Sequence, residues 1–225
     1  NEPSDKEHFS DRFGYDFSSV KKETYEWLKK NDLAVFAFRA GQEIVGADAI
    51  AILPVNAAFF AFGLSLLQGI ITFEEALNSF NLKSAIFIAP PFRHTHFNGK
   101  QVVVHERGKD LYQMFAYNLY PGPSAKKGVY GVLIDIGERE GWVTNHCSIA
   151  QVMSPYDNIT TFMHEGASGG GKSEMLEMIH REEDGRIILG ENIQTKDKRF
   201  LSIPQACKIR PVADDMALSH PSIQR

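Results

Sequence analysis

Hydrophobic and polar positions along the chain follow two periods, and the period of each stretch predicts its secondary structure. Runs rich in β-branched and aromatic residues indicate strands, whereas longer stretches with apolar residues at helical spacing indicate helices. The expected strands are 33–38, 43–45, 84–89, 101–105, 128–136, 142–149, 158–163, 186–189 and 200–203, and the expected helices are 20–30, 57–68, 72–79, 110–120 and 173–180. This mixture predicts an α/β protein.

Local signals mark where several of these elements begin and end. Thr72 followed by Glu75 predicts a helix start with a capping box. Pro90 and Pro91 end the strand before them, and the run Pro121-Gly122-Pro123-Ser124 interrupts the pattern again. We therefore expect two domains, an N-terminal α/β domain at 1–117 and a second domain at 118–225 that is rich in strands.

Composition places the chain among ordinary globular proteins. Its 225 residues carry a formal net charge of −4 and 43% hydrophobic residues, and this balance gives no basic surplus for binding nucleic acid. The longest apolar run, 55–71, is shorter than the roughly 20 residues of a membrane span, so we expect a buried helix there. No leader pattern is visible, and the expected location is the cytoplasm. Cys147 and Cys207 are too few for a disulfide framework and are expected to be reduced core residues.

The strongest chemical signal is the stretch Gly166-Ala167-Ser168-Gly169-Gly170-Gly171-Lys172-Ser173, which fits the phosphate-binding pattern G-x-x-x-x-G-K-[ST]. In such a loop the backbone N–H groups surround the phosphates of a nucleotide, the lysine reaches the outer phosphates, and the hydroxyl binds Mg²⁺. The loop stands between an expected strand and an expected helix, as the motif requires. A flexible surface loop is the alternative interpretation.

Two further motifs precede this loop. Lys126-Lys127-Gly128-Val129 and His146-Cys147-Ser148 lie upstream of it, and the loop itself has the narrower form G-x-S-G-x-G-K-S. In this order and approximate spacing the three motifs resemble the phosphoenolpyruvate carboxykinases, and the pattern is also similar to a divergent bacterial branch of uncharacterised function. The resemblance covers roughly residues 120 to 192.

The resemblance implies a fold and a set of site residues. It implies an N-terminal α/β domain followed by part of a P-loop domain with a mixed sheet. Lys172 would bind phosphate together with 166–171, Ser173 and Glu174, and the donor would be ATP or GTP with Mg²⁺. Lys127 and His146 would hold a second metal, for which an imidazole with oxygen donors suits Mn²⁺. Tyr120 and Gly122 match the start of the first motif.

The sequence departs from the family at the second metal motif. Carboxykinases carry two aspartates on the strand after the loop helix, and the sequence position assigned to them holds Glu191 and Asn192, which we take as metal ligands. The arginine motif for the substrate is not recognisable, and Arg93 and Arg107 are the nearest cationic candidates. Family members also continue far beyond this motif, so the resemblance implies that the 225 residues alone are inactive.

These observations lead to one functional hypothesis with two alternatives. The hypothesis is nucleotide-dependent phosphoryl transfer of carboxykinase type, to oxaloacetate or a related small carboxylate, with Lys172, Lys127 and His146 as catalytic residues. The alternatives are a P-loop kinase for another small acceptor and a non-catalytic module that binds nucleotide. Neither nucleic acid nor a membrane is an expected partner.

Overall fold

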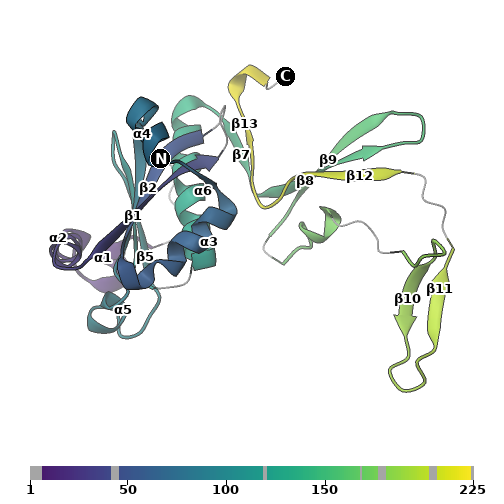
Figure 1. Ribbon diagram of the computed structural model, residues 1–225, viewed down its shortest axis with the longest axis horizontal. Coiled ribbons are helices and arrows are strands. Elements are labelled where there is room, and N and C mark those ends of the chain that lie inside the picture. The colour runs from purple at the N-terminus through teal and green to yellow at the C-terminus, as the bar shows by residue number, and fades with distance from the viewer. Residues whose placement is uncertain are drawn as a thin grey trace. The chain divides into compact units, whose positions relative to one another are not determined.

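The computed structural model describes residues 7–41, 46–118, 121–167, 169–176, 181–202 and 207–223. The chain divides into two compact units, Asn1–Glu140 and Gly141–Arg225 (Figure 1). The division falls after a long helix, whereas the sequence placed the domain boundary near 117. Helices and a sheet of mixed strand direction occur together, so the chain belongs to the α/β class, as predicted.

Unit 1 is built around a six-stranded sheet with the order β3-β1-β2-β4-β6-β5. The strands β2, β4 and β6 run parallel, and the pairs β1–β2, β1–β3 and β5–β6 are antiparallel. The elements, in chain order, are α1 Phe9–Phe13, α2 Phe17–Leu28, β1 Leu33–Gly41, β2 Gly46–Pro54, the 3₁₀ turn η1 Val55–Ala57, α3 Phe59–Leu67, β3 Gly69–Ile70, α4 Phe73–Ser79, β4 Leu82–Ile88, α5 Phe92–Thr95, β5 Val103–Arg107, β6 Tyr112–Ala116 and α6 Pro121–Glu140.

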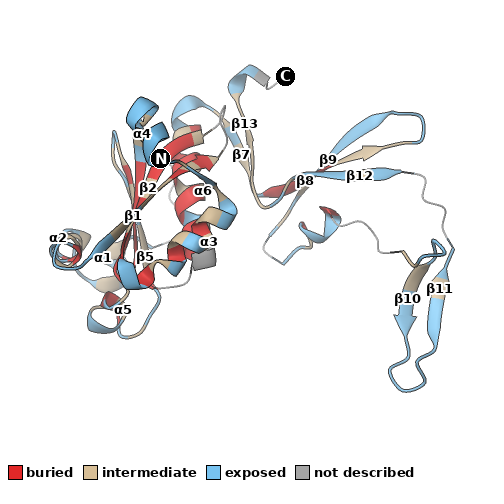
Figure 2. Ribbon diagram, viewed as in Figure 1, coloured by how far each residue is buried: buried red, intermediate tan, exposed pale blue. Residues whose placement is uncertain are grey.

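Successive side chains of a strand point to opposite faces of its sheet, and residues of both parities are buried on β4 and β6. The buried residues of the chain are red in Figure 2. Phe87 and Phe115 belong to the core that includes Val20 and Leu28 of α2. On the opposite face, Ile86 and Met114 lie against α6 near Gly128. Helices therefore cover both faces of the sheet at β4 and β6, which explains the continuous apolar sequence of these two strands.

Helix α6 corrects the predicted strand at 128–136. The β-branched residues there favoured a strand, but Ala125, Val129, Val132 and Leu133 are buried at helical spacing. The run that starts at Pro121 was interpreted as a break, yet it forms the first turn of the helix. Proline is tolerated there because the first N–H groups of a helix have no partner within it.

The expected helix at 110–120 is also wrong, because β6 occupies Tyr112–Ala116. The short run of aromatic and apolar residues is buried on both faces, and such a run cannot be assigned by periodicity alone. Its pairing with β4 and β5 on either side decides the strand.

The apolar run 55–71 is helical over η1 and α3 but is not a buried helix. Phe60 and Leu64 are fully buried, whereas Phe62 is 73% exposed and Leu66 is 88% exposed. Only one face of α3 packs against the unit.

Several sequence predictions are confirmed in unit 1. Strands β1 and β4 and helices α2, α3 and α4 occur where the patterns placed them, and 43–45 lies outside the described residues. The capping box is present: the Thr72 hydroxyl accepts from the Glu75 N–H, and the Glu75 carboxylate accepts from the Thr72 N–H at 2.7 Å.

Unit 2 contains a three-stranded antiparallel sheet of order β12-β8-β9, a hairpin of β10 and β11, and an antiparallel pair of the distant strands β7 and β13. Its elements are β7 Val143–Asn145, β8 Cys147–Met153, β9 Ile159–Glu165, the 3₁₀ turn η2 Glu174–Leu176, β10 Ile187–Glu191, β11 Lys198–Leu201, β12 Lys208–Ala213, β13 Ala217–Ser219 and the 3₁₀ turn η3 Pro221–Ile223. Strand β9 confirms the prediction at 158–163. Of the helix expected at 173–180, the described part is the 3₁₀ turn η2, and 177–180 lies outside the described residues.

Candidate functional site

The three-stranded sheet brings three segments of unit 2 to one of its ends. Strand β8 is central and antiparallel to both neighbours, so its start lies beside the ends of β9 and β12. Cys147 at the start of β8 is paired with Glu165 at the end of β9, and Ile149 is paired with Ala213 at the end of β12. His146 precedes β8, the glycine loop follows β9, and an aspartate pair follows β12.

The glycine loop leaves the sheet after Glu165, and it does not continue the strand. Gly169 and Gly171 have φ angles of 80° and 79°, in the left-handed region that glycine adopts without strain. A turn is closed inside the loop by the Gly170 N–H, which donates to the Ala167 carbonyl at 3.0 Å. Ser168, a predicted phosphate ligand, lies outside the described residues. The described loop is mostly exposed, which leaves its backbone accessible to a ligand.

Lys172 is the buried residue of the loop, with only 8% of its surface exposed. Its Nζ donates to the carbonyls of Gly166 and Ala167, each at 3.0 Å. Its own carbonyl accepts from the Ser148 hydroxyl at 2.6 Å, and Ser148 is fully buried at the start of β8. The amino group of Lys172 thus points back into the loop. The hydroxyl of Ser148 on β8 fixes the loop backbone at Lys172.

Ser173 and Asp214 connect the loop to β12. The Ser173 hydroxyl donates to Asp214 Oδ1 at 2.9 Å, and both residues are exposed. Asp214 follows the last residue of β12, a strand that the sequence analysis did not predict. A loop hydroxyl bonded to a strand-end carboxylate is an arrangement of oxygen donors that suits a hard divalent cation.

Asp215 lies beside His146. Its Oδ1 is 3.1 Å from His146 Nε2. Asp215 has a φ of 77°, an uncommon conformation for a residue other than glycine that aspartate tolerates better than most. The neighbouring aspartates therefore reach different partners, the loop serine and the upstream histidine.

The sequence analysis did not single out Asp214 and Asp215, and its assignment of Glu191 and Asn192 as metal ligands stays a prediction. The structure gives those two residues roles in the β10–β11 hairpin. Glu191 is paired with Lys196 at 3.5 Å, and Asn192 Oδ1 accepts from the Gln194 N–H at 2.9 Å, which forms an Asx turn. The sequence does contain a signal for Asp214 and Asp215. They form an adjacent aspartate pair directly after the run at 208–213, which follows the β10–β11 hairpin.

The remaining predicted residues fall in different places. Lys127 is exposed on α6 in unit 1, so its shared metal site with His146 stays a prediction. Lys126 lies over the Tyr130 ring, with Nζ 5.4 Å from the centroid. Tyr120 lies outside the described residues, and Gly122 is in the first turn of α6. Glu174 begins η2 and is exposed.

The two cysteines are both free, and they differ in burial. Cys147 is fully buried, and this burial raises the pKa of its thiol, an effect that nearby Glu165 reinforces. A raised thiol pKa opposes a nucleophilic role, which agrees with the expected core position. Cys207 is exposed, so the core position expected for it is wrong.

Within the described ranges, His, Cys, Asp and Glu side chains do not gather in groups of three or more that could hold a metal ion. The helices of the described residues include none with the length and apolar character needed to span a membrane.

Comparison with known protein families places the chain in one of them. The model described as "Domain of unknown function (DUF4914)" matches residues 1–225. The chain belongs to this family. No curated protein matches the chain.

Proposed function

We propose that the chain binds a nucleoside triphosphate through 166–173 and takes part in phosphoryl transfer of carboxykinase type to a small carboxylate. The proposal includes the finer fold assignment, a P-loop domain similar to that of the phosphoenolpyruvate carboxykinases. The acceptor is oxaloacetate or a related enolate, and the donor is ATP or GTP with a divalent metal.

The observation that supports the proposal best is the pair of contacts at the end of the β12-β8-β9 sheet. Ser173 of the glycine loop is bonded to Asp214, and His146 of the upstream motif lies beside Asp215. Ser173 and His146 belong to two different sequence motifs. Both contact the aspartate pair 214–215, a segment that neither motif includes. A surface loop that merely contained Gly, Lys and Ser would require no such convergence.

The donor set fits the metals that the proposal requires. Hydroxyl and carboxylate oxygens from Ser173 and Asp214 suit Mg²⁺, and the imidazole of His146 with the carboxylate of Asp215 suits Mn²⁺. A bound cation would supply charge neutralisation at the transferring phosphoryl group. The chain itself would position the phosphates through loop N–H groups and the Lys172 ammonium, which must leave the Gly166 and Ala167 carbonyls to reach them.

Nucleotide binding is tested by titration calorimetry with Mg²⁺·ATP and Mg²⁺·GTP on the wild-type chain, Lys172→Ala and Lys198→Ala. We expect saturable binding that Lys172→Ala weakens at least tenfold, because charge-assisted hydrogen bonds to phosphate are lost. Lys198 is an exposed lysine on β11, and its replacement should leave binding unchanged. Equal affinity in wild type and Lys172→Ala would refute the assigned role of the loop.

The reaction is tested separately, on the full-length protein in the presence of Mn²⁺. Oxaloacetate-dependent consumption of ATP or GTP that Lys172→Ala abolishes is the expected result. Turnover with another hydroxy or keto acid alone would favour a different kinase. Nucleotide binding without turnover across acceptors and metals would favour the non-catalytic module.

A further inference from the structure

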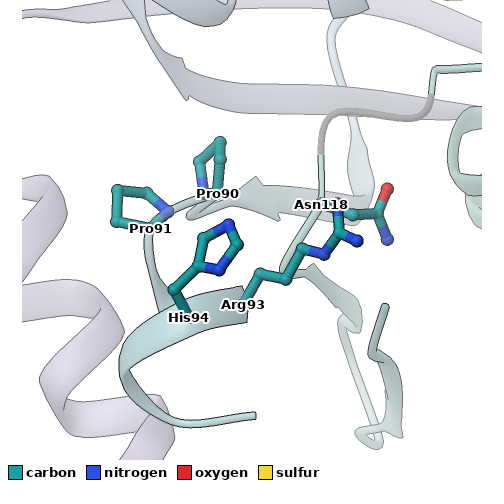
Figure 3. Close-up of a pocket in the computed structure, with 5 residues that line it drawn as sticks. All are labelled: Pro90, Pro91, Arg93, His94 and Asn118. Atoms are coloured by element: carbon teal, nitrogen blue, oxygen red, sulfur yellow. The ribbon is translucent and has the colours of Figure 1, made fainter. Parts of the chain in front are cut away.

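Unit 1 contains a pocket at the carboxyl ends of two parallel strands (Figure 3). Its volume is about 260 Å³, and the described residues that line it are Pro90, Pro91, Arg93, His94 and Asn118. The first four follow β4 and Asn118 follows β6. The carboxyl ends of neighbouring parallel strands are the usual place for a ligand in an open α/β sheet.

Arg93 is held rigidly at this pocket. Its neighbour Phe92 and nearby Phe97 are both buried in the core of unit 1. Gly99 holds the arginine at two points: the Arg93 Nε donates to the Gly99 carbonyl at 2.6 Å, and the Gly99 N–H donates to the Arg93 carbonyl at 2.7 Å. Gly99 has a φ of 77°, which a glycine adopts without strain.

The terminal guanidinium nitrogens of Arg93 remain available. Within the described part of the chain, Nε is the only guanidinium atom of Arg93 with a hydrogen bond, and no carboxylate pairs with this side chain. A planar guanidinium with two parallel donors matches the geometry of a carboxylate. The anchored Nε therefore orients the free edge of the fork before any ligand arrives.

The other walls complete an anion-binding environment. Asn118 is only 3% exposed, and the buried Ser124 hydroxyl donates to its Oδ1 at 2.9 Å, which fixes the amide at the wall of the pocket. The exposed ring of His94 adds a second nitrogen donor. Pro90 and Pro91 supply an apolar wall, and none of the described lining residues is acidic.

We propose that this pocket binds a small organic carboxylate, with the carboxylate on the Arg93 fork and the carbon skeleton against the two proline rings. The volume lies below the ~300–1,000 Å³ of pockets for drug-sized ligands, so a small acid suits it. Inorganic phosphate could use the same fork but would leave the apolar wall without a contact. The site lies within unit 1 and does not depend on the nucleotide function proposed above.

Titration calorimetry of the whole chain with succinate, succinamide and inorganic phosphate at constant ionic strength tests the proposal. Succinamide has the same carbon skeleton without the charge. We expect saturable binding of succinate, at least tenfold weaker binding of succinamide, and weaker binding of phosphate than of succinate. The same titrations in Lys172→Ala separate this site from the glycine loop, and the succinate affinity should not change.

Variants of Arg93 test whether succinate binds in this pocket. Arg93→Gln should weaken succinate at least tenfold, and Arg93→Lys should weaken it less because the charge remains while the fork is lost. Arg12→Gln is the matched control, since it removes an exposed arginine of the same unit that lies over the Phe13 ring and has no proposed role in binding. Its succinate affinity should equal that of the wild type.

Thermal unfolding of each variant shows whether the fold is retained. If Arg93→Gln does not fold, Arg93→Lys and His94→Gln, a variant at an exposed position, test the proposal instead. Each should bind succinate several-fold more weakly than the wild type. Absence of saturable succinate binding to the wild type would overturn the proposal. So would unchanged affinity in the folded Arg93 variants, or tighter binding of phosphate than of succinate in Lys172→Ala, where the glycine loop no longer contributes its lysine.

Discussion

The hydroxyl of Ser173 donates a hydrogen bond to Asp214 Oδ1 at 2.9 Å, and this contact joins the glycine loop to the end of β12. The two residues are 41 positions apart, with the β10–β11 hairpin between them. Under the proposed function, this contact makes Asp214 a candidate ligand of the nucleotide metal, in addition to Glu191 and Asn192, which motif spacing had suggested.

Asp214→Asn tests the charge of that carboxylate. The asparagine carbonyl can still accept the Ser173 hydrogen bond, so the fold should be retained while the negative charge is lost. We expect the affinity for Mg²⁺·ATP to fall about tenfold or more, the range typical of groups that support a metal site. Titration of nucleotide at several Mg²⁺ concentrations measures the change.

Asp215→Asn tests the second carboxylate in the same way, with Mn²⁺ as the titrant. The variant keeps an oxygen beside His146 but removes a charged ligand, so Mn²⁺ binding should weaken about tenfold. Glu191→Gln is the control for both aspartates, because Glu191 is paired with Lys196 in the hairpin. If Glu191→Gln weakened metal binding and the aspartate variants did not, the sequence assignment of Glu191 as a ligand would be supported against Asp214 and Asp215.

Ser148→Ala should destabilise unit 2. The substitution removes the hydroxyl that donates to the backbone carbonyl of the buried residue Lys172. This loss should lower the free energy of unfolding by about 1–3 kcal/mol. In a Trp27→Phe background the remaining tryptophan, Trp142, reports on unit 2 by fluorescence during denaturant unfolding. Ser202→Ala, at an exposed position of the same unit, should have an unchanged midpoint.

Gly131→Ala should destabilise unit 1 through the packing of α6. A Cβ at this position would lie 2.0 Å from the Tyr112 hydroxyl and 2.7 Å from Cζ of the same ring, so the helix or the ring must shift. The expected loss is about 1–3 kcal/mol, reduced by the higher helix propensity of alanine. Gly128→Ala should cost less, because the atoms it meets belong to the flexible ends of Ile86 and Met114. Equal stability of Gly131→Ala and wild type would contradict this packing.

Alkaline pH should unfold unit 1 in part through Tyr117. Burial raises the pKa of this phenol above its ordinary value of 10.0, and its oxygen is 2.9 Å from the Thr24 hydroxyl. Because the folded state favours the protonated form, this stabilisation is complete below about pH 10 and is lost as the pH rises above it.

The measurement is the free energy of unfolding as a function of pH. Tyr117→Phe should flatten the decline above pH 10, although it is less stable at neutral pH because the Thr24 contact is lost. Tyr15→Phe, at a residue that is 40% exposed, should leave the slope as it is in the wild type. An identical slope in Tyr117→Phe would mean that another group controls alkaline unfolding.

Features with a local physical cause could be predicted from the sequence. The capping box at Thr72 depends on contacts within one turn, and β9 together with the glycine loop depends on β-branched residues followed by glycines. Helix α6 was within reach, because Ala125, Val129 and Val132 already had helical spacing. Strand propensity was given too much weight there, although a packed helix face readily overrides it.

Sequence patterns were sufficient for the α/β class, for α2, α3, α4, β1 and β4 of unit 1, and for the glycine loop as the segment that follows β9, because these depend on periodicity and on short-range backbone chemistry. That β6 is a strand depends on its neighbours in the fold, since β4 and β5 supply its hydrogen bonds. The tertiary structure also decided that Asp214 and Asp215 face Ser173 and His146. Strand pairing between distant segments sets such contacts, and spacing along one chain carries no record of which strands will be neighbours.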